Sequence, residues 1–143
     1  MTPSQIQLVQ STLPFIVAEK EQVARLFYSR LFQLDPALRD FFGDDLAQQG
    51  QKVVTMLGTL IGGLARPEQI VPILQALGQR HAEYGVKDSH YATAGSALLW
   101  TLERCLGSGF TAEMRDAWIA FYFVVSRTMI AGSRVVMPMR KAS

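Results

Sequence analysis

Apolar residues recur at intervals of three and four positions along almost the whole chain, which is the spacing of one face of a helix. The segment 70–81 shows the pattern clearly, because Ile70, Leu74, Leu77 and His81 share one helical face. No segment alternates between apolar and polar residues in the way that a half-buried strand requires. The pattern therefore predicts an all-α protein of about seven helices joined by short loops.

Proline, glycine and capping residues divide this pattern into helices. Thr2 and Pro3 begin the first helix, and Pro14 is expected to end or kink it, because proline lacks a donor and clashes with the preceding turn. The further helices are predicted over 19–34, from Pro36 to Gly43, from a cap at Asp44 or Asp45 to the break at "GGLARP", over the segment that ends near His81, from a cap at Asp88 or Ser89 to Leu106, and from Thr111 past Met129. Their uneven lengths favour a globin-like orthogonal packing over a regular helical bundle.

The composition fits one soluble domain over residues 1–143, with 133–143 as a flexible tail. The net charge of +2 is close to balanced and gives no reason to expect a nucleic-acid partner. No segment has the ~20 apolar residues of a membrane span, and the first residues lack the pattern of a signal peptide. Cys105 is the single cysteine and cannot form an internal disulfide. We therefore expect a cytoplasmic protein that is a monomer or a weak homo-oligomer.

Three polar residues interrupt apolar helix faces and are candidates for chemistry: Tyr28, Gln49 and His81. A neutral imidazole is a common axial ligand of haem iron, and a phenol or an amide can donate a hydrogen bond to a bound ligand. Taken singly, each residue has a structural alternative. His81 would then be a core histidine bonded to a carbonyl, Tyr28 an ordinary core tyrosine, and Gln49 a solvated residue of a first helical turn. Their combination favours a haem pocket.

Residues beside these three extend the candidate pocket. Phe41 and Phe42 either form an apolar wall of it or belong to the plain core. Lys52 and Arg80 lie next to pocket positions, where they either pair with haem propionates or remain solvated surface charges. His90 is close to a helix start, and we interpret it as a surface or capping residue instead of a second iron ligand.

Four stretches of the sequence point to a known family: "LFYSRLF", "DP" followed by "FF", "LGQRHAEYGVKDSHY" and "GSGFTAEMRDAW". With them, the chain resembles the bacterial single-domain haemoglobins of the Hell's Gate type, which are similar to the globin domain of flavohaemoglobins. The resemblance extends from the first helix to Ile130, and the segment around His81 is its most specific part. It implies a globin fold packed around one haem b.

The resemblance also implies roles for individual residues. His81 matches the proximal ligand of the iron, and Tyr28 and Gln49 match distal residues that donate hydrogen bonds to bound dioxygen. Phe42 matches the phenylalanine that stacks on the haem, and Tyr91 matches a tyrosine that neighbours the iron-bound histidine. The predicted haem-contacting set is Phe42, Lys52, Val53, Leu57, Leu77, Arg80, His81, Val86 and Tyr91.

Two departures from flavohaemoglobins change the expectation. In that family a glutamate of the last helix joins the proximal histidine and tyrosine, whereas here no glutamate follows Glu113, and Asp116 stands near the start of that helix. A carboxylate bonded to the imidazole would raise its donor strength, so less peroxidase-like iron is expected without it. The chain also carries no glycine-rich dinucleotide motif after a strand, so turnover is expected to need a separate reductase.

We therefore expect a protein that binds dioxygen, NO and CO reversibly, with dioxygen held tightly by two donors in an apolar pocket. Slow release suits nitric oxide dioxygenation, in which dioxygen and NO leave as nitrate. The alternatives are dioxygen storage or scavenging without turnover, and gas sensing through a partner. A helical scaffold without haem is a further alternative, but it leaves Tyr28, Gln49 and His81 together as a coincidence.

Overall fold

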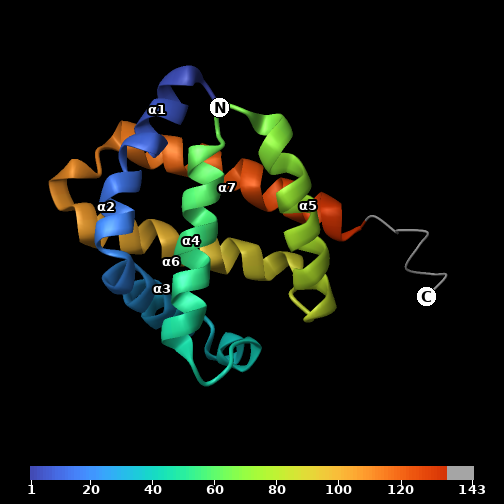
Figure 1. The fold of residues 1–143 in the computed structure, drawn as a ribbon. Helices are drawn as coiled ribbons and strands as arrows, with labels where there is room; N and C mark the ends of the chain where they lie inside the picture. Colours follow the sequence, from blue (N-terminus) through green and yellow to red (C-terminus); the bar gives the residue numbers. More distant parts are fainter. Residues whose placement is uncertain (135–143) are drawn as a thin grey trace.

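The computed structural model describes residues 1–134, which form helices and short loops (Figure 1). The helices of this part are α1 (Pro3–Ser11), α2 (Leu13–Ala18), α3 (Lys20–Leu34), the 3-10 helix η1 (Pro36–Phe41), α4 (Leu46–Gly62), α5 (Pro67–Glu83), α6 (Asp88–Leu106), the 3-10 helix η2 (Gly107–Gly109) and α7 (Ala112–Ser133). The described residues contain no strand, so the predicted all-α class is confirmed. None of their helices is both long enough and apolar enough to cross a membrane.

Side-chain caps begin several helices where the sequence predicts them. The Thr2 hydroxyl accepts a hydrogen bond of 3.1 Å from the Gln5 amide, and the Gln5 side chain accepts one of 3.0 Å from the Thr2 amide. The Asp45 carboxylate accepts a hydrogen bond of 3.0 Å from the Gln48 amide, and Thr111 caps α7 in the same way. Each cap satisfies an N–H group that the first helical turn leaves without a partner.

Two helix starts differ from the prediction. The first helix ends ahead of Pro14, which lies in the first turn of α2, where its missing N–H costs no hydrogen bond. α6 begins at Asp88 without the predicted cap from Asp88 or Ser89. Instead, His90 Nδ1 accepts a hydrogen bond of 2.9 Å from the Lys87 amide, so a side chain of the first turn satisfies the N–H ahead of it. The interpretation of His90 as a capping residue is confirmed.

The last helix, α7, packs against helices from both halves of the chain. It contacts α1 and α5 and also packs on α6. It extends to Ser133, the first residue of the expected tail, and the Arg134 guanidinium pairs with the Asp88 carboxylate at the start of α6 at 2.6 Å. The remainder of that tail, 135–143, lies outside the described residues.

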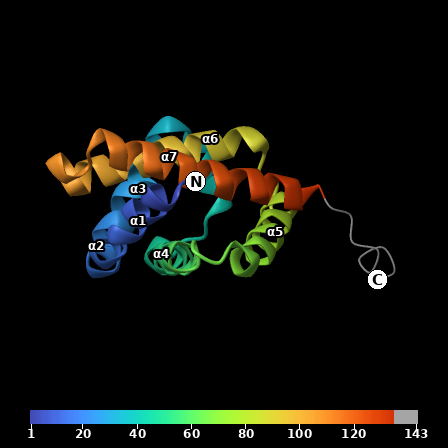
Figure 2. The same cartoon turned by 90° about the horizontal axis from the view of Figure 1, so that it is seen from above.

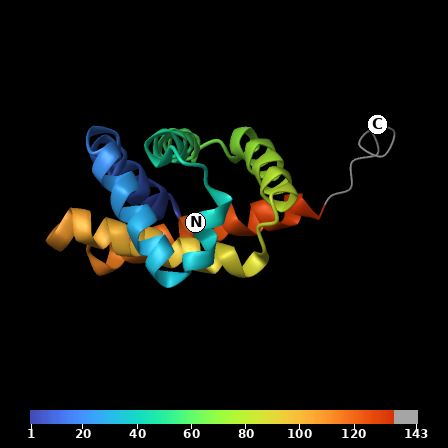
Figure 3. The same ribbon diagram turned by 90° about the horizontal axis from the view of Figure 1, so that it is seen from below.

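The helices are arranged in two layers. α6 and α7 lie side by side in one layer, and α4 and α5 lie on one side of it (Figure 2 and Figure 3). α5 and α7 approach closely because glycine stands at their crossing. A Cβ at Gly132 would lie 2.6 Å from Gln75 Cα, and one at Gly78 would overlap the Met129 carbonyl. The missing side chains therefore let α5, which carries His81, lie directly on α7.

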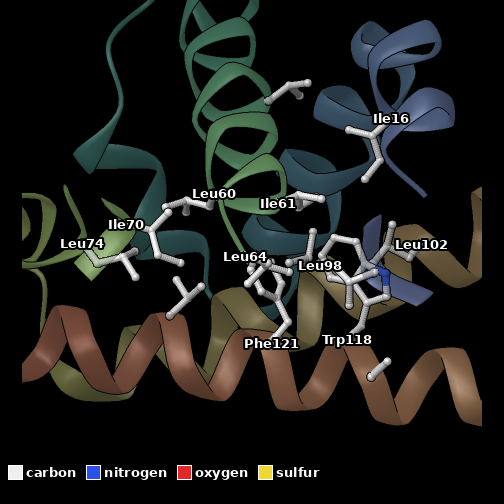
Figure 4. Close-up of a cluster of buried hydrophobic side chains, with 14 of the residues drawn as sticks. Ile16, Leu60, Ile61, Leu64, Ile70, Leu74, Leu98, Leu102, Trp118 and Phe121 are labelled. Carbon is white, nitrogen blue, oxygen red and sulfur yellow. The ribbon is translucent and has the colours of Figure 1, made fainter. Parts of the chain in front are cut away.

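The main core lies between α7 and the helices that cross it (Figure 4). Its most deeply buried large side chains are Ile16, Ile61, Leu74, Leu102, Trp118 and Phe121, which come from α2, α4, α5, α6 and α7. The Trp118 and Phe121 rings meet edge to face at 5.3 Å. Burial of these apolar side chains is the main contribution to the stability of the fold. A smaller apolar cluster surrounds Tyr28 and Leu31 of α3.

Candidate functional site

A mostly apolar cavity of about 230 Å³ lies between α3, η1, α4, α5, α6 and α7. Its lining residues are Phe27, Leu31, Leu38, Phe41, Phe42, Val53, His81, Val86, His90, Tyr91, Ala94, Tyr122, Val125 and Met129. Phe41 and Val53 are 39% and 38% exposed, so the cavity reaches solvent beside them. The structure thus brings several of the predicted site residues together in one lining, namely Phe42, Val53, His81, Val86 and Tyr91.

His81 lies in the last turn of α5, where a backbone carbonyl orients its imidazole. Its Nδ1–H donates a hydrogen bond of 2.8 Å to the carbonyl oxygen of Leu77, one turn earlier. In the neutral ring this leaves Nε2 without a proton, and its lone pair is available to a metal ion. Burial lowers the pKa of His81 below the ordinary 6.5, although the Leu77 carbonyl opposes the shift, and the charge of Arg80 adds to it. The neutral imidazole that a metal requires is therefore favoured.

Two tyrosines support His81 from α6 and α7. The Tyr91 ring stacks on the His81 imidazole, with the ring centroids 6.3 Å apart and 27° between the planes. The Tyr122 hydroxyl donates a hydrogen bond of 2.6 Å to the Tyr91 carbonyl. Gly95 provides space for the Tyr122 ring, since a Cβ at Gly95 would come within 2.6 Å of it. Burial raises the pKa of Tyr122, and burial together with the charge of Asp88 raises the pKa of Tyr91, so both phenols stay protonated at neutral pH.

The last helix brings no carboxylate to the cavity wall within the described residues. Its lining residues are Tyr122, Val125 and Met129. Glu113 and Asp116 are exposed near the start of α7. A backbone carbonyl accepts the hydrogen bond from His81 Nδ1. This agrees with the sequence, which lacks the glutamate that flavohaemoglobins have in the last helix.

Tyr28 carries a buried hydroxyl that has no hydrogen-bond partner within residues 1–134. The residue is 4% exposed, and its ring packs on Phe27, Phe32 and Phe42 at centroid distances of 5.5, 5.8 and 5.1 Å. Tyr28 itself is not among the lining residues, and its ring packs on two residues that are, Phe27 and Phe42. Burial raises the pKa of Tyr28 to about 12, which keeps the hydroxyl protonated. A buried polar atom without a partner is unusual, and this one is suited to donate to a ligand.

The helix α4 presents Val53 to the cavity, with Gln49 and Leu57 outside the lining. Gln49 is half-buried one helical turn ahead of Val53, and Leu57 packs against the main core. Gly50 allows α4 to approach α3 closely, because a Cβ at Gly50 would stand 2.7 Å from the Ala24 Cβ, and the same Cβ would be in ordinary contact with the Tyr28 ring at 3.5 Å. The start of α4 therefore lies next to Tyr28, and the predicted roles of Gln49 and Leu57 stay predictions.

The predicted partners of the haem propionates also lie outside the lining. Lys52 and Arg80 are exposed, and each directly precedes a lining residue in the sequence. Their pairing with propionates stays a prediction. Leu77 is absent from the lining as well. Its carbonyl orients His81, which is a role that the sequence did not predict.

The sequence analysis missed part of the cavity lining. The missed residues are Phe27, Leu31, Leu38, His90, Ala94, Tyr122, Val125 and Met129. Val125 and Met129 share the apolar face of α7. Their spacing predicts that they are buried, but it does not predict that they line a cavity. Tyr122 is a polar residue three positions ahead of Val125, the same kind of interruption of an apolar face that identified Tyr28.

The residues of this cavity fit a haem group. Its apolar and aromatic walls suit a porphyrin ring, and His81 Nε2 suits iron as an axial ligand. The Tyr28 hydroxyl, buried without a partner in the described structure on a ring that packs on the lining residue Phe42, suits a small polar ligand at the iron. His90, the other histidine, accepts a hydrogen bond through Nδ1 at the start of α6 and so carries its proton on Nε2. It is therefore a donor and does not compete with His81 as an iron ligand.

Comparisons with known proteins agree with this arrangement. A flavohemoprotein of Bordetella parapertussis is 28% identical over 139 residues, which cover 95% of this chain and 35% of the relative. The chain thus spans about a third of the length of that relative. A bacterial globin from Campylobacter jejuni has a similar structure, with a TM-score of 0.84 and 20% identity over 93% of this chain and 96% of that one. A flavohemoglobin from Malassezia yamatoensis with bound FAD and heme gives a TM-score of 0.76 and 23% identity, over 93% of this chain and 36% of that one.

The family assignment follows from the sequence match. The structural similarities lie below 25% identity and show the fold. The family model described as Globin matches residues 25–129, which include Tyr28, His81 and Tyr91. With this match over most of its length, the chain belongs to the globin family.

Proposed function

We propose that this protein binds haem b through His81, holds dioxygen tightly and oxidises NO to nitrate with electrons from a separate reductase. One observation carries the proposal: the His81 imidazole, oriented by the Leu77 carbonyl, lines the cavity, and the ring of Tyr28 packs on the lining residue Phe42 while its buried hydroxyl has no partner in the described structure. Membership of the globin family supports haem and gas binding. The reaction with NO is argued from the chemistry of these residues.

His81 is the proposed axial ligand. When bound, haem iron supplies reversible binding of dioxygen, NO and CO and takes up the electron that dioxygenation consumes. The Leu77 carbonyl fixes the tautomer and orientation of the imidazole, as partners of metal-bound histidines generally do. The stacked Tyr91 ring restricts its rotation. Because a neutral carbonyl polarises the imidazole less than a carboxylate does, we expect less peroxidase-like behaviour than in globins with a proximal glutamate.

Tyr28 is the proposed donor to dioxygen in the cavity. Its hydroxyl stays protonated, because burial raises the pKa of Tyr28 to about 12. A hydrogen bond to a polarised ligand is stronger in a low-dielectric cavity than in water, and contributes about 1 kcal/mol or more. Each ~1.4 kcal/mol corresponds to a tenfold change in affinity. Gln49, one turn ahead of the lining residue Val53, is the proposed second donor.

Tight retention of dioxygen favours a reaction in the cavity over delivery. NO is small and uncharged, so apolar walls such as Phe42, Val53 and Val86 do not exclude it. An NO molecule that enters then meets dioxygen already held there. The reaction balances as NO plus dioxygen plus one electron giving nitrate, so turnover needs a reductase. The cytoplasm is the proposed setting, and the unpaired Cys105 suits a reducing compartment.

The test is to mix haem-loaded, dioxygen-saturated protein with NO and to measure nitrate per haem. The proposal predicts stoichiometric nitrate from a single mixing, and continued nitrate formation once a flavin reductase and reduced nicotinamide are added. Tyr28→Phe is the matched variant and should form less nitrate, because it releases dioxygen sooner. Displacement of dioxygen by NO without nitrate would contradict the reaction and leave dioxygen storage or scavenging as the function.

A further inference from the structure

The chain has two histidines, and both line the same cavity. His81 is the proposed iron ligand, whereas His90, on the first turn of α6, has no part in the proposed function. His90 stands beside Phe41, whose ring lies 5.4 Å away at an interplanar angle of 66°. Phe41 is 39% exposed, so this part of the lining forms the rim where the cavity reaches solvent.

The backbone determines which nitrogen of His90 is available. Its Nδ1 accepts a hydrogen bond of 2.9 Å from the Lys87 amide. An imidazole that accepts through Nδ1 carries its proton on Nε2. The Nε2–H group is therefore a donor, on a ring that the Lys87 amide and the Phe41 ring hold in place.

Two other polar side chains of the lining are already engaged in hydrogen bonds. His81 Nδ1 is bonded to the Leu77 carbonyl, and the Tyr122 hydroxyl is bonded to the Tyr91 carbonyl. The Tyr91 ring stacks on His81, whereas His90 contacts the exposed Phe41. His90 thus brings a donor to the lining beside the exposed Phe41, where the polar edge of an otherwise apolar ligand would meet solvent.

We propose that His90 Nε2–H donates a hydrogen bond to a propionate carboxylate of the bound haem and so slows haem loss. The inference rests on the proposed haem binding at His81. It gives His90 a second role besides its cap on α6, and it assigns the propionate contact to a lining residue instead of the exposed Lys52 and Arg80. A hydrogen bond to a charged group is among the stronger ones that a protein makes.

Two substitutions separate the proposed donor from the cap. Glutamine and glutamate at this helix position both accept a hydrogen bond from the preceding amide, so His90→Gln and His90→Glu should both keep the start of α6. Glutamine also offers an N–H donor, whereas glutamate places a negative charge beside the propionate. We expect His90→Glu to transfer haem to excess apomyoglobin at least ~10-fold faster than His90→Gln, with equal thermal melting of the two apo-proteins.

Esterified haem tests whether the propionate is the group involved. With haem dimethyl ester the negative charges are removed, and the difference between His90→Glu and His90→Gln should shrink. Equal loss rates with ordinary haem, or an unchanged difference with the ester, would overturn the assignment. If His90→Glu does not fold, His90→Phe replaces it in both comparisons, provided that its apo-protein melts with that of His90→Gln, because phenylalanine removes the cap together with the donor. Failure of the proposed function looks different, because the wild-type protein would then show no Soret band with either haem.

Discussion

The packed core and the cavity are built by the same helices but are filled in different ways. The core side chains of Ile61, Leu74 and Trp118 are fully buried. At the cavity, Phe41 and Val53 keep 39% and 38% of their surface exposed. Full burial against other side chains contributes stability, whereas partly exposed apolar side chains around a cavity are suited to contact a ligand. The difference separates the fully buried core from the exposed rim of the cavity, whereas Val125 and Met129 belong both to the core and to the cavity lining.

Buried polar groups show the same division. In the core, the hydroxyls of Thr12 and Thr101 donate to the carbonyls of Val9 and Ala97 at 2.6 and 2.8 Å. Tyr28, whose ring packs on the lining residue Phe42, has no such partner among the described residues. Trp118 Nε1 in the core also lacks a partner within residues 1–134, and nothing in the structure explains it. Tyr28 differs from Trp118 in its surroundings, because the Tyr28 ring contacts Phe42, which lines the cavity.

The largest expected effect comes from opening the core. Leu74→Ala removes a side chain that is fully buried, and we expect it to lower the free energy of unfolding by about 2–5 kcal/mol. Val53→Ala shortens a side chain that is 38% exposed at the cavity, and should cost less than about 1 kcal/mol. Urea titrations of the apo-proteins measure both. Similar losses for the two variants would contradict the division between core and cavity.

The second largest effect on stability is expected at the crossing of α5 and α7. Gly78→Ala places a methyl group against the Met129 backbone, and should lower the free energy of unfolding by about 1–3 kcal/mol. Gly62→Ala is the matched control, because a Cβ there meets nothing within 4 Å. The same urea titration should find that variant as stable as the wild type or slightly more stable. A neutral Gly78→Ala would show that the two helices separate easily.

The next effect concerns Tyr28→Phe, which should change dioxygen release without lowering the stability of the apo-protein. It removes a buried hydroxyl that has no partner in the described structure, so we expect the apo-protein to be unchanged or more stable by up to about 1 kcal/mol. The haem-loaded variant should release dioxygen about tenfold faster. Denaturant titration and stopped-flow release measure the two quantities. A clear loss of apo-protein stability would mean that the hydroxyl has a structural partner.

The smallest effect concerns alkaline pH. Burial raises the pKa of Tyr28 from 10.0 to about 12, so between these values the folded protein keeps a proton that the unfolded chain releases. The contribution to stability is complete below pH 10.0 and is lost as the pH rises toward about 12. The urea midpoint should therefore fall more steeply between pH 10.0 and about pH 12 in the wild type than in Tyr28→Phe. Equal slopes would contradict the raised pKa.

Local chemistry explains which helix boundaries the sequence predicts. Thr2, Asp45 and Thr111 are ordinary capping residues, and each caps the helix that follows it. The start of α6 was predicted wrongly because its cap is an imidazole inside the first turn, on His90, where a serine, threonine or aspartate ahead of the helix was expected.

Some residues of the cavity lining could be predicted, namely those that one helix or the family pattern determines. His81 and Val53 stand on apolar faces readable from their own helices, and Phe42, Val86 and Tyr91 also belong to the cavity lining. Tyr122 was missed because its role depends on a hydrogen bond to the backbone of another helix, and on the space that a glycine leaves there. Such contacts arise only from the packing of α7 on α6.

The account depends most on His81 as the ligand of haem iron. The direct test is the absorption spectrum of purified protein supplied with haem, recorded ferric, reduced, and reduced with CO. We predict a Soret band that shifts at each step, is lost or displaced in His81→Ala, and is kept in His90→Gln, a change at the other histidine of the chain. No Soret band, or the same spectra in His81→Ala, would contradict the account and make His81 a core histidine bonded to the Leu77 carbonyl.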